Sequence, residues 1–435
     1  MKRKLFLSFL TLELLSLFGA CSNEDIPDAP RLDDSIQVTN PGLDRALQIV
    51  EEMMKELDGG ATRSSRRIAT IEQVNQLTRS DVQAPNWFLV NYDDEAGFAL
   101  VNDAKIYCPV YGIANTGSLS MTDTTENKGL AIVLNKIFTM GHIQSLEYSN
   151  NGDSVAQVYD WGGGYIPGQP ITPTFPTDSL KQPWTPITPP VTTITGPFLT
   201  SYVQNWSQYE PFNELCPVVY DEDGQNPKKG LVGCCPLAVA MIMSHYQWPM
   251  TYYSASPDET YEFHWDEIRD YRYRYATSRL TRELSRAYNL DAHWEYDQTP
   301  VPNSQTYVPR TFENFGYLKP TFQDFAVNTG VTLTNGNPVY IQGSYTDSKG
   351  EKKGHAWVID GVMTIKANDA GDSPNTSKSY YHCVWGWSGM SNGYFYMYDS
   401  VDPGIPYEWD YEVFGLSPGK LYKDLKIIGS VYPVK

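Results

Sequence analysis

The sequence predicts an α+β protein with two folded parts joined by a proline-rich linker. The larger part starts at Phe198, opens with helical patterns and is dominated by strands from Pro338 to the end, an order typical of α+β folds. The smaller, upstream part shows a helix, a hairpin and a second helix. With 435 residues, 41% of them hydrophobic and 13% aromatic, the chain is long enough for two or three domains and lacks the composition of a disordered protein.

The first 21 residues have the pattern of an export signal. Three basic residues at positions 2–4 precede a short apolar run, and Gly19 and Ala20 stand before Cys21. This order resembles a bacterial lipobox, in which Cys21 would be lipidated; the alternative is a plain signal peptide that happens to end near a cysteine. The run is too short for a stable transmembrane helix. Acidic residues just after Cys21 are similar to signals for the outer face of the outer membrane. We therefore expect a surface-exposed outer-membrane lipoprotein whose membrane contact is the lipid on Cys21.

Residues 22–160 are expected to form a small α+β domain with no evident catalytic cluster. Apolar residues recur at helical spacing from Leu43 to Leu57. The stretch Trp87–Asn102 has two apolar runs around a polar turn, which is typical of a hairpin. A second helix is predicted from Glu126 to Ser145.

Residues 161–197 are predicted to be an extended, exposed linker. Nine prolines lie in this range, and such stretches cannot form a helix. An exposed linker is where a protease would cut, although a passive spacer has the same composition. The rest of the chain, 198–435, forms the second domain.

One stretch of the second domain, Gly233–Pro249, reads GCCPLAVAMIMSHYQWP and predicts a buried helix with a thiol at its N-terminus. Pro236 suits the first helical turn, and the residues after it are apolar on all sides. At this end of a helix the dipole and the free N–H groups favour the thiolate, which is the nucleophilic form. The alternative is that Cys234 and Cys235 are ordinary buried thiols.

A nucleophilic cysteine needs a base, and His355 in GHAWVIDG is the candidate. It is expected to begin an alternating, half-buried strand facing a cleft; the alternative is a surface strand residue. His245 lies eleven residues after Cys234 on the same predicted helix, about 16 Å of rise and too far for a hydrogen bond. His382 is predicted to be structural, in the middle of an aromatic strand.

The overall charge and the cysteine and histidine spacings exclude several classes of function. A net charge of −18 and a pI of about 4.7 argue against nucleic acid or an anionic membrane as a partner. There is no HExxH motif and no CxxC pair, so neither a zinc site nor any other metal or cofactor is expected. Besides Cys21 the chain has five cysteines, so at least one is free if the others pair.

Four segments, in the same order along the chain, resemble motifs of the streptopain family of papain-like cysteine peptidases. They are NWSQYEPFNELCP, the GCCPLAVAMIMSHYQWP stretch, NPVYIQGSY followed by GHAWVIDG, and WGWSGMSNGYFYM. The likeness covers roughly Gly196 to the end. It implies a papain-like fold, with a helical part that carries the nucleophile and an antiparallel sheet that carries the histidine. The upstream domain is similar to the family's inhibitory propeptide.

The resemblance also implies roles for single residues. Cys234 aligns with the nucleophile, His355 with the general base and acid, and Gln208 with the side-chain donor of the oxyanion hole. The second oxyanion donor would be the Cys234 backbone N–H. Trp385 and Trp387 align with tryptophans that pack beside the histidine and shield the pair from water.

Three departures from the family pattern stand out. Many relatives have an asparagine before the first tryptophan, where it can orient the histidine; here that residue is Val384, so Trp385 would have to hold the ring. Leu237 and Met241 replace small or polar residues on the nucleophile helix and suggest altered packing. Residues 401–413 replace a glycine-rich loop, so substrate selection is expected to differ.

We expect a secreted cysteine endopeptidase that is made as a zymogen and hydrolyses protein or peptide substrates through a Cys–His dyad. Its own propeptide would inhibit it until a cut within 161–197, for which Lys181–Gln182 is one candidate, and the peptidase domain would then be released. Val384 motivates an alternative, a catalytically silent surface protein that binds peptides or host proteins. A transferase using the same thiol is a third option.

Overall fold

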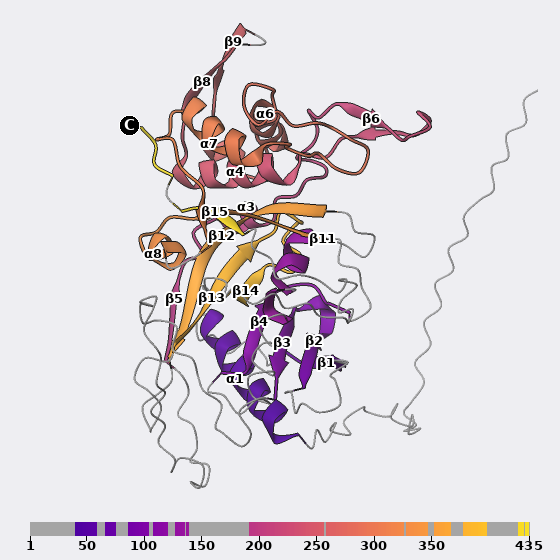
Figure 1. Ribbon diagram of the computed structural model, residues 1–435, viewed down its shortest axis with the longest axis vertical. Coiled ribbons are helices and arrows are strands. Elements are labelled where there is room, and N and C mark those ends of the chain that lie inside the picture. Colours follow the sequence, from indigo (N-terminus) through magenta and orange to yellow (C-terminus); the bar gives the residue numbers. More distant parts are fainter. Residues whose placement is uncertain are drawn as a thin grey trace, which may run out of the picture. The chain divides into compact units, whose positions relative to one another are not determined.

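The structure, a computed structural model, describes residues 40–58, 66–74, 86–103, 108–120, 127–134, 136–138, 191–255, 258–325, 328–346, 352–366, 377–397, 425–429 and 431–434 (Figure 1). The chain divides into two units, 1–39 and 40–435, and every described residue lies in the second. Within that described part, no helix is long and apolar enough to cross a membrane. The predicted signal, most of the predicted linker and the segment 401–413 lie outside the described residues.

One antiparallel sheet runs through the unit, and eleven strands of it fall in the described part of the chain. The order is β1-β2-β3-β4-β14-β13-β12-β11-β15-β10, with β5 also paired to β12. The upstream strands join the downstream ones where Ile113 pairs with Tyr394. The strands are β1 (Ile68–Val74), β2 (Trp87–Tyr92), β3 (Phe98–Asn102), β4 (Val110–Ala114), β5 (Val191–Thr195), β10 (Gln323–Asp324), β11 (Val339–Thr346), β12 (Lys352–Lys366), β13 (Ser377–Val384), β14 (Gly393–Tyr396) and β15 (Lys426–Ile428).

The upstream elements follow the sequence prediction closely. Helix α1 (Pro41–Leu57) begins after Asn40, whose side chain accepts hydrogen bonds from two backbone N–H groups of the first turn. Strands β2 and β3 form the predicted hairpin, with the short 3₁₀ helix η1 (Asp93–Glu95) in the turn. Residues 128–134 and 136–138 are helical, inside the range predicted for the second helix.

The described downstream part also contains helices, several of which gather above the sheet in Figure 1. They are α3 (Ser201–Gln204), α4 (Cys234–Tyr246), α5 (Trp265–Ile268), α6 (Arg274–Leu284), α7 (Ser304–Asn314) and α8 (Asn328–Thr334), with two small hairpins, β6 (Val218–Tyr220) with β7 (Pro227–Lys229) and β8 (Thr251–Ala255) with β9 (Asp258–Glu262). Helix α4 contacts β12, β11, α6 and α7, so it lies between the helical layer and the sheet.

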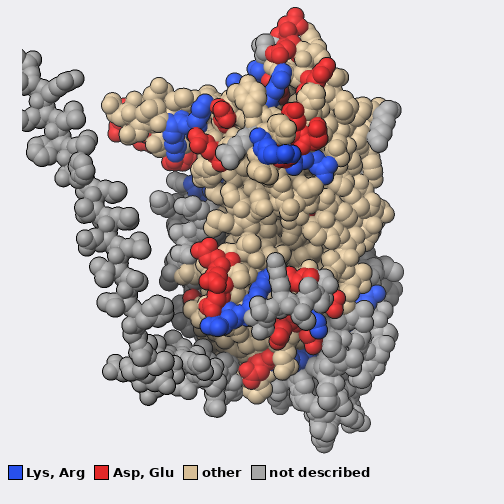
Figure 2. All heavy atoms as spheres, turned by 180° about the vertical axis from the view of Figure 1, so that it is seen from behind, with Lys and Arg blue, Asp and Glu red and all other residues tan. Residues whose placement is uncertain are grey.

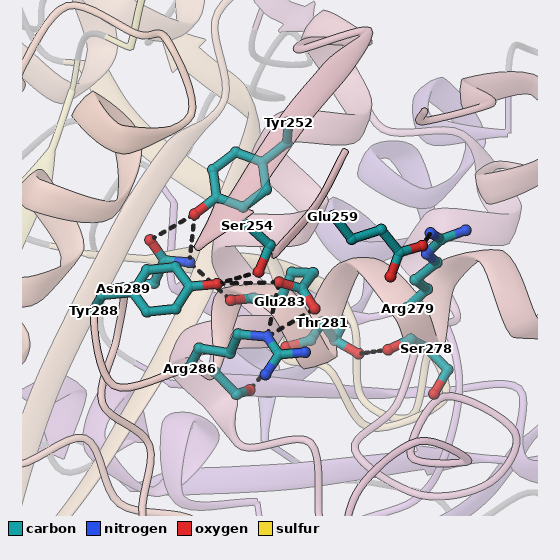
Figure 3. Close-up of polar contacts among 11 residues, drawn as sticks. Tyr252, Ser254, Glu259, Ser278, Arg279, Thr281, Glu283, Arg286, Tyr288 and Asn289 are labelled. Atoms are coloured by element: carbon teal, nitrogen blue, oxygen red, sulfur yellow. Dashed lines mark hydrogen bonds and ion pairs between the residues drawn. The ribbon is translucent and has the colours of Figure 1, made fainter. Parts of the chain in front are cut away.

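The spacing of Leu280, Leu284 and Tyr288 predicts a helix from Ser278 to Tyr288, but α6 ends at Leu284, four residues earlier. A buried polar network explains the difference (Figure 3). The buried Glu283 carboxylate accepts two hydrogen bonds of 2.8 Å from the Arg286 side chain. The Asn289 side chain donates to the Glu283 carbonyl over 2.8 Å, which turns the chain back on the helix end.

Strand β12 is buried on both faces, so the prediction of a half-buried, alternating strand is wrong. Every residue from His355 to Met363 is buried. On one face Trp357 and Ile359 belong to a core that includes the helical residues 130–134. On the other face Ala356 and Val358 belong to the core around α4. A strand covered on both sides has no polar face to alternate with.

The end of the predicted linker 161–197 is a strand and not an exposed spacer. Residues Val191–Thr195 form β5, which pairs with residues 362–366 of β12. Gly196 follows with φ +84°, and a Cβ there would lie 2.4 Å from the Asp360 carbonyl oxygen. Only glycine fits this close approach.

Charged side chains of both signs lie side by side on the face shown in Figure 2. Several basic side chains are paired with acids, such as Arg279 with Glu259 over 3.2 Å and Lys228 with Asp297 over 2.7 Å. The expectation that nucleic acid is not a partner rests on net charge and stays a prediction.

Candidate active site

Cys234 is the first residue of α4, as the sequence predicted. Gly233 before it has φ +91°, and a Cβ there would lie 3.0 Å from the Thr299 carbonyl oxygen, so the tight entry into the helix needs glycine. The ten residues from Cys235 to Ser244 are all buried, which confirms a helix that is enclosed on every side. Cys234 itself is half-buried, so its thiol is the member of the pair that remains accessible.

His355 lies on β12 and is 5% exposed. Its Nε2 is 2.9 Å from the main-chain carbonyl oxygen of Trp385, which can only accept. This bond places a proton on Nε2 and leaves Nδ1 for the thiol. The imidazole ring is near-parallel to those of Trp357 and Trp387, with centroids 6.2 and 6.4 Å away.

The Trp385 carbonyl answers the question raised by Val384. The Val384 side chain is buried in the core around α4 and has no polar group. The acceptor beside the histidine is therefore a main-chain oxygen one residue later, and that this oxygen suffices without a side-chain amide at position 384 stays a prediction.

The surroundings of Cys234 favour its thiolate. The pKa of Cys234 lies well below its usual range, first because the Cys235 thiol donates a hydrogen bond to it, and then because the His355 imidazole and the Ala356 backbone N–H also point to it. The pKa of Cys235 is raised by the same bond and by burial. Tyr340 donates to the Cys235 sulfur over 3.4 Å. Of the two adjacent thiols, Cys234 is therefore the one whose thiolate form its surroundings favour.

Gln208 lies beside the nucleophile loop. It is 6% exposed, and its carbonyl accepts a hydrogen bond of 3.0 Å from the backbone N–H of Val232. On its other side Ser207 pairs with Trp387. Gln208 therefore lies on a segment that contacts both the loop before Cys234, at Val232, and the loop after Trp385, at Trp387. An oxyanion donor would be needed in this place.

The structure thus brings Cys234, His355, Gln208 and Trp385 to one place, and their catalytic roles stay predictions. The rejected histidines are used elsewhere. His382 Nδ1 is 2.5 Å from a buried carboxylate oxygen of Asp360, which fits the predicted structural role.

A residue of the upstream part touches this site, and no sequence pattern predicted it. Gly129 is buried in the first turn of the helix that begins after Asn127. A Cβ on Gly129 would lie 2.7 Å from His355 Cδ2 and 2.7 Å from Trp385 Cε3. The absence of a side chain at Gly129 lets this helix lie directly against the histidine.

Among the described residues, no group of three or more His, Cys, Asp or Glu side chains is placed to hold a metal ion. Two other residues near the site were not predicted from the sequence. The Asn392 side chain accepts a hydrogen bond from the Trp385 N–H, and the Asp360 carboxylate binds His382.

A half-buried thiol at the start of an enclosed helix, facing an imidazole on an antiparallel sheet, is the arrangement of a papain-like cysteine peptidase. Residues 206–395 match the Peptidase C10 family. This region of the chain belongs to that family, the streptopain family of cysteine peptidases, as its motifs predicted. The predicted α+β fold of papain-like type, with a helical part that carries the cysteine and an antiparallel sheet that carries the histidine, is confirmed.

Individual relatives agree. Streptopain from Streptococcus pyogenes is 25% identical over 264 residues, which cover 52% of this chain and 59% of streptopain. The thiol protease/hemagglutinin PrtT from Porphyromonas gingivalis is 26% identical over 355 residues, 73% of this chain and 34% of that protein. The chain therefore spans less than two thirds of the length of either relative.

Two solved structures from Prevotella intermedia are also similar. A fragment of prointerpain A aligns with a TM-score of 0.42 and 16% identity, covering 83% of this chain and 99% of that one. Active wild-type interpain A aligns with a TM-score of 0.35 and 19% identity, covering 55% and 95%.

Proposed function

We propose that this protein is a cysteine endopeptidase that is made as a zymogen and hydrolyses peptide bonds in protein or peptide substrates. The observation that carries the proposal is the pairing of Cys234 with His355 at the start of α4, with the imidazole fixed by the Trp385 carbonyl. Membership of residues 206–395 in a peptidase family supports it.

The reaction follows from this geometry. The Cys234 thiolate attacks the peptide carbonyl carbon, and the oxygen takes up the negative charge. The Cys234 backbone N–H and the Gln208 side-chain amide would bind that oxyanion; loss of one such donor typically costs about 10²–10³ in rate. The C–N bond then breaks, and the His355 imidazolium gives its proton to the leaving amine.

The second half of the reaction uses the same groups. A water molecule loses a proton to His355 as it attacks the thioester carbonyl. When the new tetrahedral species breaks down, the carbon–sulfur bond is cleaved and the Cys234 thiolate is restored beside the imidazolium. The other product is the carboxylic acid of the substrate.

Latency is assigned to the upstream part, 22–160. Gly129 places a helix against His355, and β4 is paired with β14. The Thr116 hydroxyl also donates to the Gly389 carbonyl over 2.7 Å. These contacts would keep a substrate from the histidine until the upstream part leaves.

Activation would follow a cut in the predicted linker. Because β5 belongs to the sheet, a cut before residue 191 would leave that strand with the peptidase, and the candidate bond Lys181–Gln182 meets this condition. Lipidation of Cys21 and exposure at the outer-membrane surface are part of the same proposal and rest on the export pattern of residues 1–21.

The test compares wild type, Cys234→Ala and Cys383→Ala after the linker has been trimmed. Cys383 is a fully buried thiol on β13 and serves as the matched cysteine control. We expect wild type and the control to cleave casein and to be labelled by a thiol-directed peptidase inhibitor, and Cys234→Ala to do neither. A trimmed wild type that cleaves nothing and takes no label would refute the proposal and favour the silent binder.

A further inference from the structure

The orientation of His355 depends on a main-chain carbonyl, and a carbonyl is aimed only as well as its own residue is held. A side-chain amide at position 384 would have been fixed by strand β13, which ends there. Trp385 instead is the first residue after the strand and is followed by a turn with positive φ at Gly386 and Ser388. The position of Trp385 must therefore depend on contacts outside strand β13.

Asn392 supplies one of the two hydrogen bonds that hold Trp385. Its side-chain oxygen accepts from the Trp385 backbone N–H over 3.2 Å. The Trp385 indole N–H donates to the Ser391 carbonyl over 2.7 Å. Asn392 is 6% exposed, so water does not readily replace the bond if the side chain is removed.

The peptide that follows Trp385 is held from the opposite side by the nucleophile helix. A Cβ on Gly386 would lie 2.7 Å from Leu237 Cδ2. Leu237 is one of the residues by which this helix departs from the family pattern. Leu237 therefore packs against the turn that follows Trp385, which leaves little room for this turn to move.

The other end of the Asn392 amide connects to the oxyanion side of the site. Its Nδ2 donates to the Gln204 carbonyl over 2.9 Å. Gln204 is the last residue of α3, four residues before Gln208. One buried amide therefore accepts from the residue that orients the histidine and donates to the segment that carries the proposed oxyanion donor.

We propose that Asn392 is a positioning residue. It holds Trp385 so that the Trp385 carbonyl keeps the His355 proton on Nε2, and it does the work of the asparagine that this chain lacks at position 384. The inference rests on the proposed peptidase function, since only a reacting histidine needs this orientation.

Three variants test it. Asn392→Leu has nearly the same volume and makes neither hydrogen bond. Asn392→Asp keeps an acceptor for the Trp385 N–H and loses the donor to Gln204. Asn289→Leu is the matched control, because Asn289 is also a fully buried asparagine with several hydrogen bonds and lies in the separate network of Figure 3.

Two measurements are needed. Nitrogen-15 NMR of histidine-labelled full-length chain reports which ring nitrogen of His355 is protonated, with the signal assigned by its loss in His355→Ala. Steady-state kinetics on chains trimmed by added wild-type enzyme give kcat and KM separately. The NMR measurement needs no turnover, so it tests the inference even if no peptidase activity is found.

In wild type we expect a protonated Nε2 with a distinct N–H signal. In Asn392→Leu that signal should broaden or move, and kcat should fall by about 10- to 100-fold with KM within about threefold, as expected for a misplaced catalytic group. Asn392→Asp should keep the signal and lose less than about tenfold in kcat, because it keeps the acceptor.

Three results would overturn the inference. The first is a wild type whose His355 Nε2 carries no proton at neutral pH. The second is an Asn392→Leu variant with kcat within twofold of wild type, or one that loses no more than Asn289→Leu does. The third result applies if Asn392→Leu does not fold: it is the loss of the His355 Nε2–H signal in Asn392→Asp. If wild type is inactive while its His355 signal responds to Asn392, the proposed function fails and the positioning role stands.

Discussion

The contact between Gly129 and the histidine gives the sharpest prediction about latency. Replacing Gly129 by alanine adds one methyl group, and its carbon would lie 2.7 Å from both His355 Cδ2 and Trp385 Cε3. Carbon atoms in van der Waals contact are about 3.5–4.0 Å apart. The helix or the histidine must therefore move by nearly an ångström.

We expect the helix to move. His355 is held by the Trp385 carbonyl and Trp385 by two further hydrogen bonds, whereas Gly129 lies in the first turn of its helix, just after the side-chain cap at Asn127. Overpacking of a buried site costs about 1–3 kcal/mol, which corresponds to about a 5- to 150-fold change in an equilibrium. The fraction of full-length chains with an uncovered site should rise by that factor.

The assay is the initial rate of fluorogenic peptide hydrolysis by freshly prepared full-length chain, extrapolated to zero time so that processing does not contribute. Gly330→Ala is the control, because a Cβ on this helical glycine of α8 meets only the Tyr381 hydroxyl, at 3.9 Å. An initial rate of Gly129→Ala within twofold of wild type, or below it, would refute the reasoning. A rate within twofold of wild type would mean that the helix does not limit substrate access to the site. A lower rate would mean that His355, and not the helix, has moved.

Three further predictions concern thiol chemistry and stability. Cys235→Ala removes the main donor to the nucleophile, so the pKa of Cys234 should rise and the acid limb of its iodoacetamide alkylation rate should move to higher pH; an unmoved limb would contradict this. Asp360→Ala leaves the buried His382 ring and the Leu199 N–H without their acceptor and should lower the free energy of unfolding by about 1–3 kcal/mol in urea titrations, with Cys234→Ala as the background to prevent self-cleavage; an unchanged free energy of unfolding would count against it. Burial lowers the pKa of Lys378 from its unfolded value of 10.5 to about 8. Burying the charged lysine therefore lowers the free energy of unfolding by its full amount below pH 8, and this loss becomes smaller as the pH rises towards 10.5. Between pH 7.5 and 9.5, stability should therefore rise by about 2 kcal/mol more in wild type than in Lys378→Met, and parallel pH profiles would show that the lysine does not titrate there.

Local pattern sufficed for much of the fold. The helix after Gly233 is apolar on all sides, and the hairpin at Trp87–Asn102 has its turn in the middle, so each could be predicted from a short window. The end of α6 could not, because Asn289 and Glu283 bond across a turn that no periodicity encodes.

Features that depend on the far side of an element were also beyond the sequence. The burial of β12 on both faces requires the upstream helix to cover one of them. The pairing of β4 with β14 joins residues about 280 positions apart, and the sequence of neither strand indicates which strand it will pair with.

The site shows the same division. Cys234 and His355 were predicted because a reactive thiol and its base have recognisable neighbours. The acceptor of His355 was expected at position 384 because a sequence motif consists of side chains. Every residue has a backbone carbonyl, so the sequence alone does not indicate which carbonyl accepts the hydrogen bond. Only the course of the chain through Gly386 shows which carbonyl serves.

The loop that follows Trp385 connects activity with latency. Asn392 holds the residue that orients the histidine, and the Asn392 carbonyl accepts a hydrogen bond of 2.9 Å from the backbone N–H of Asn115 in the upstream part. The Thr116 hydroxyl binds the same loop at Gly389. The upstream part therefore stabilises the loop in the arrangement that the reaction needs while its helix covers His355. Under the proposed function, we therefore expect the dyad to be assembled before the upstream part leaves, so that activation uncovers the site without rearranging it.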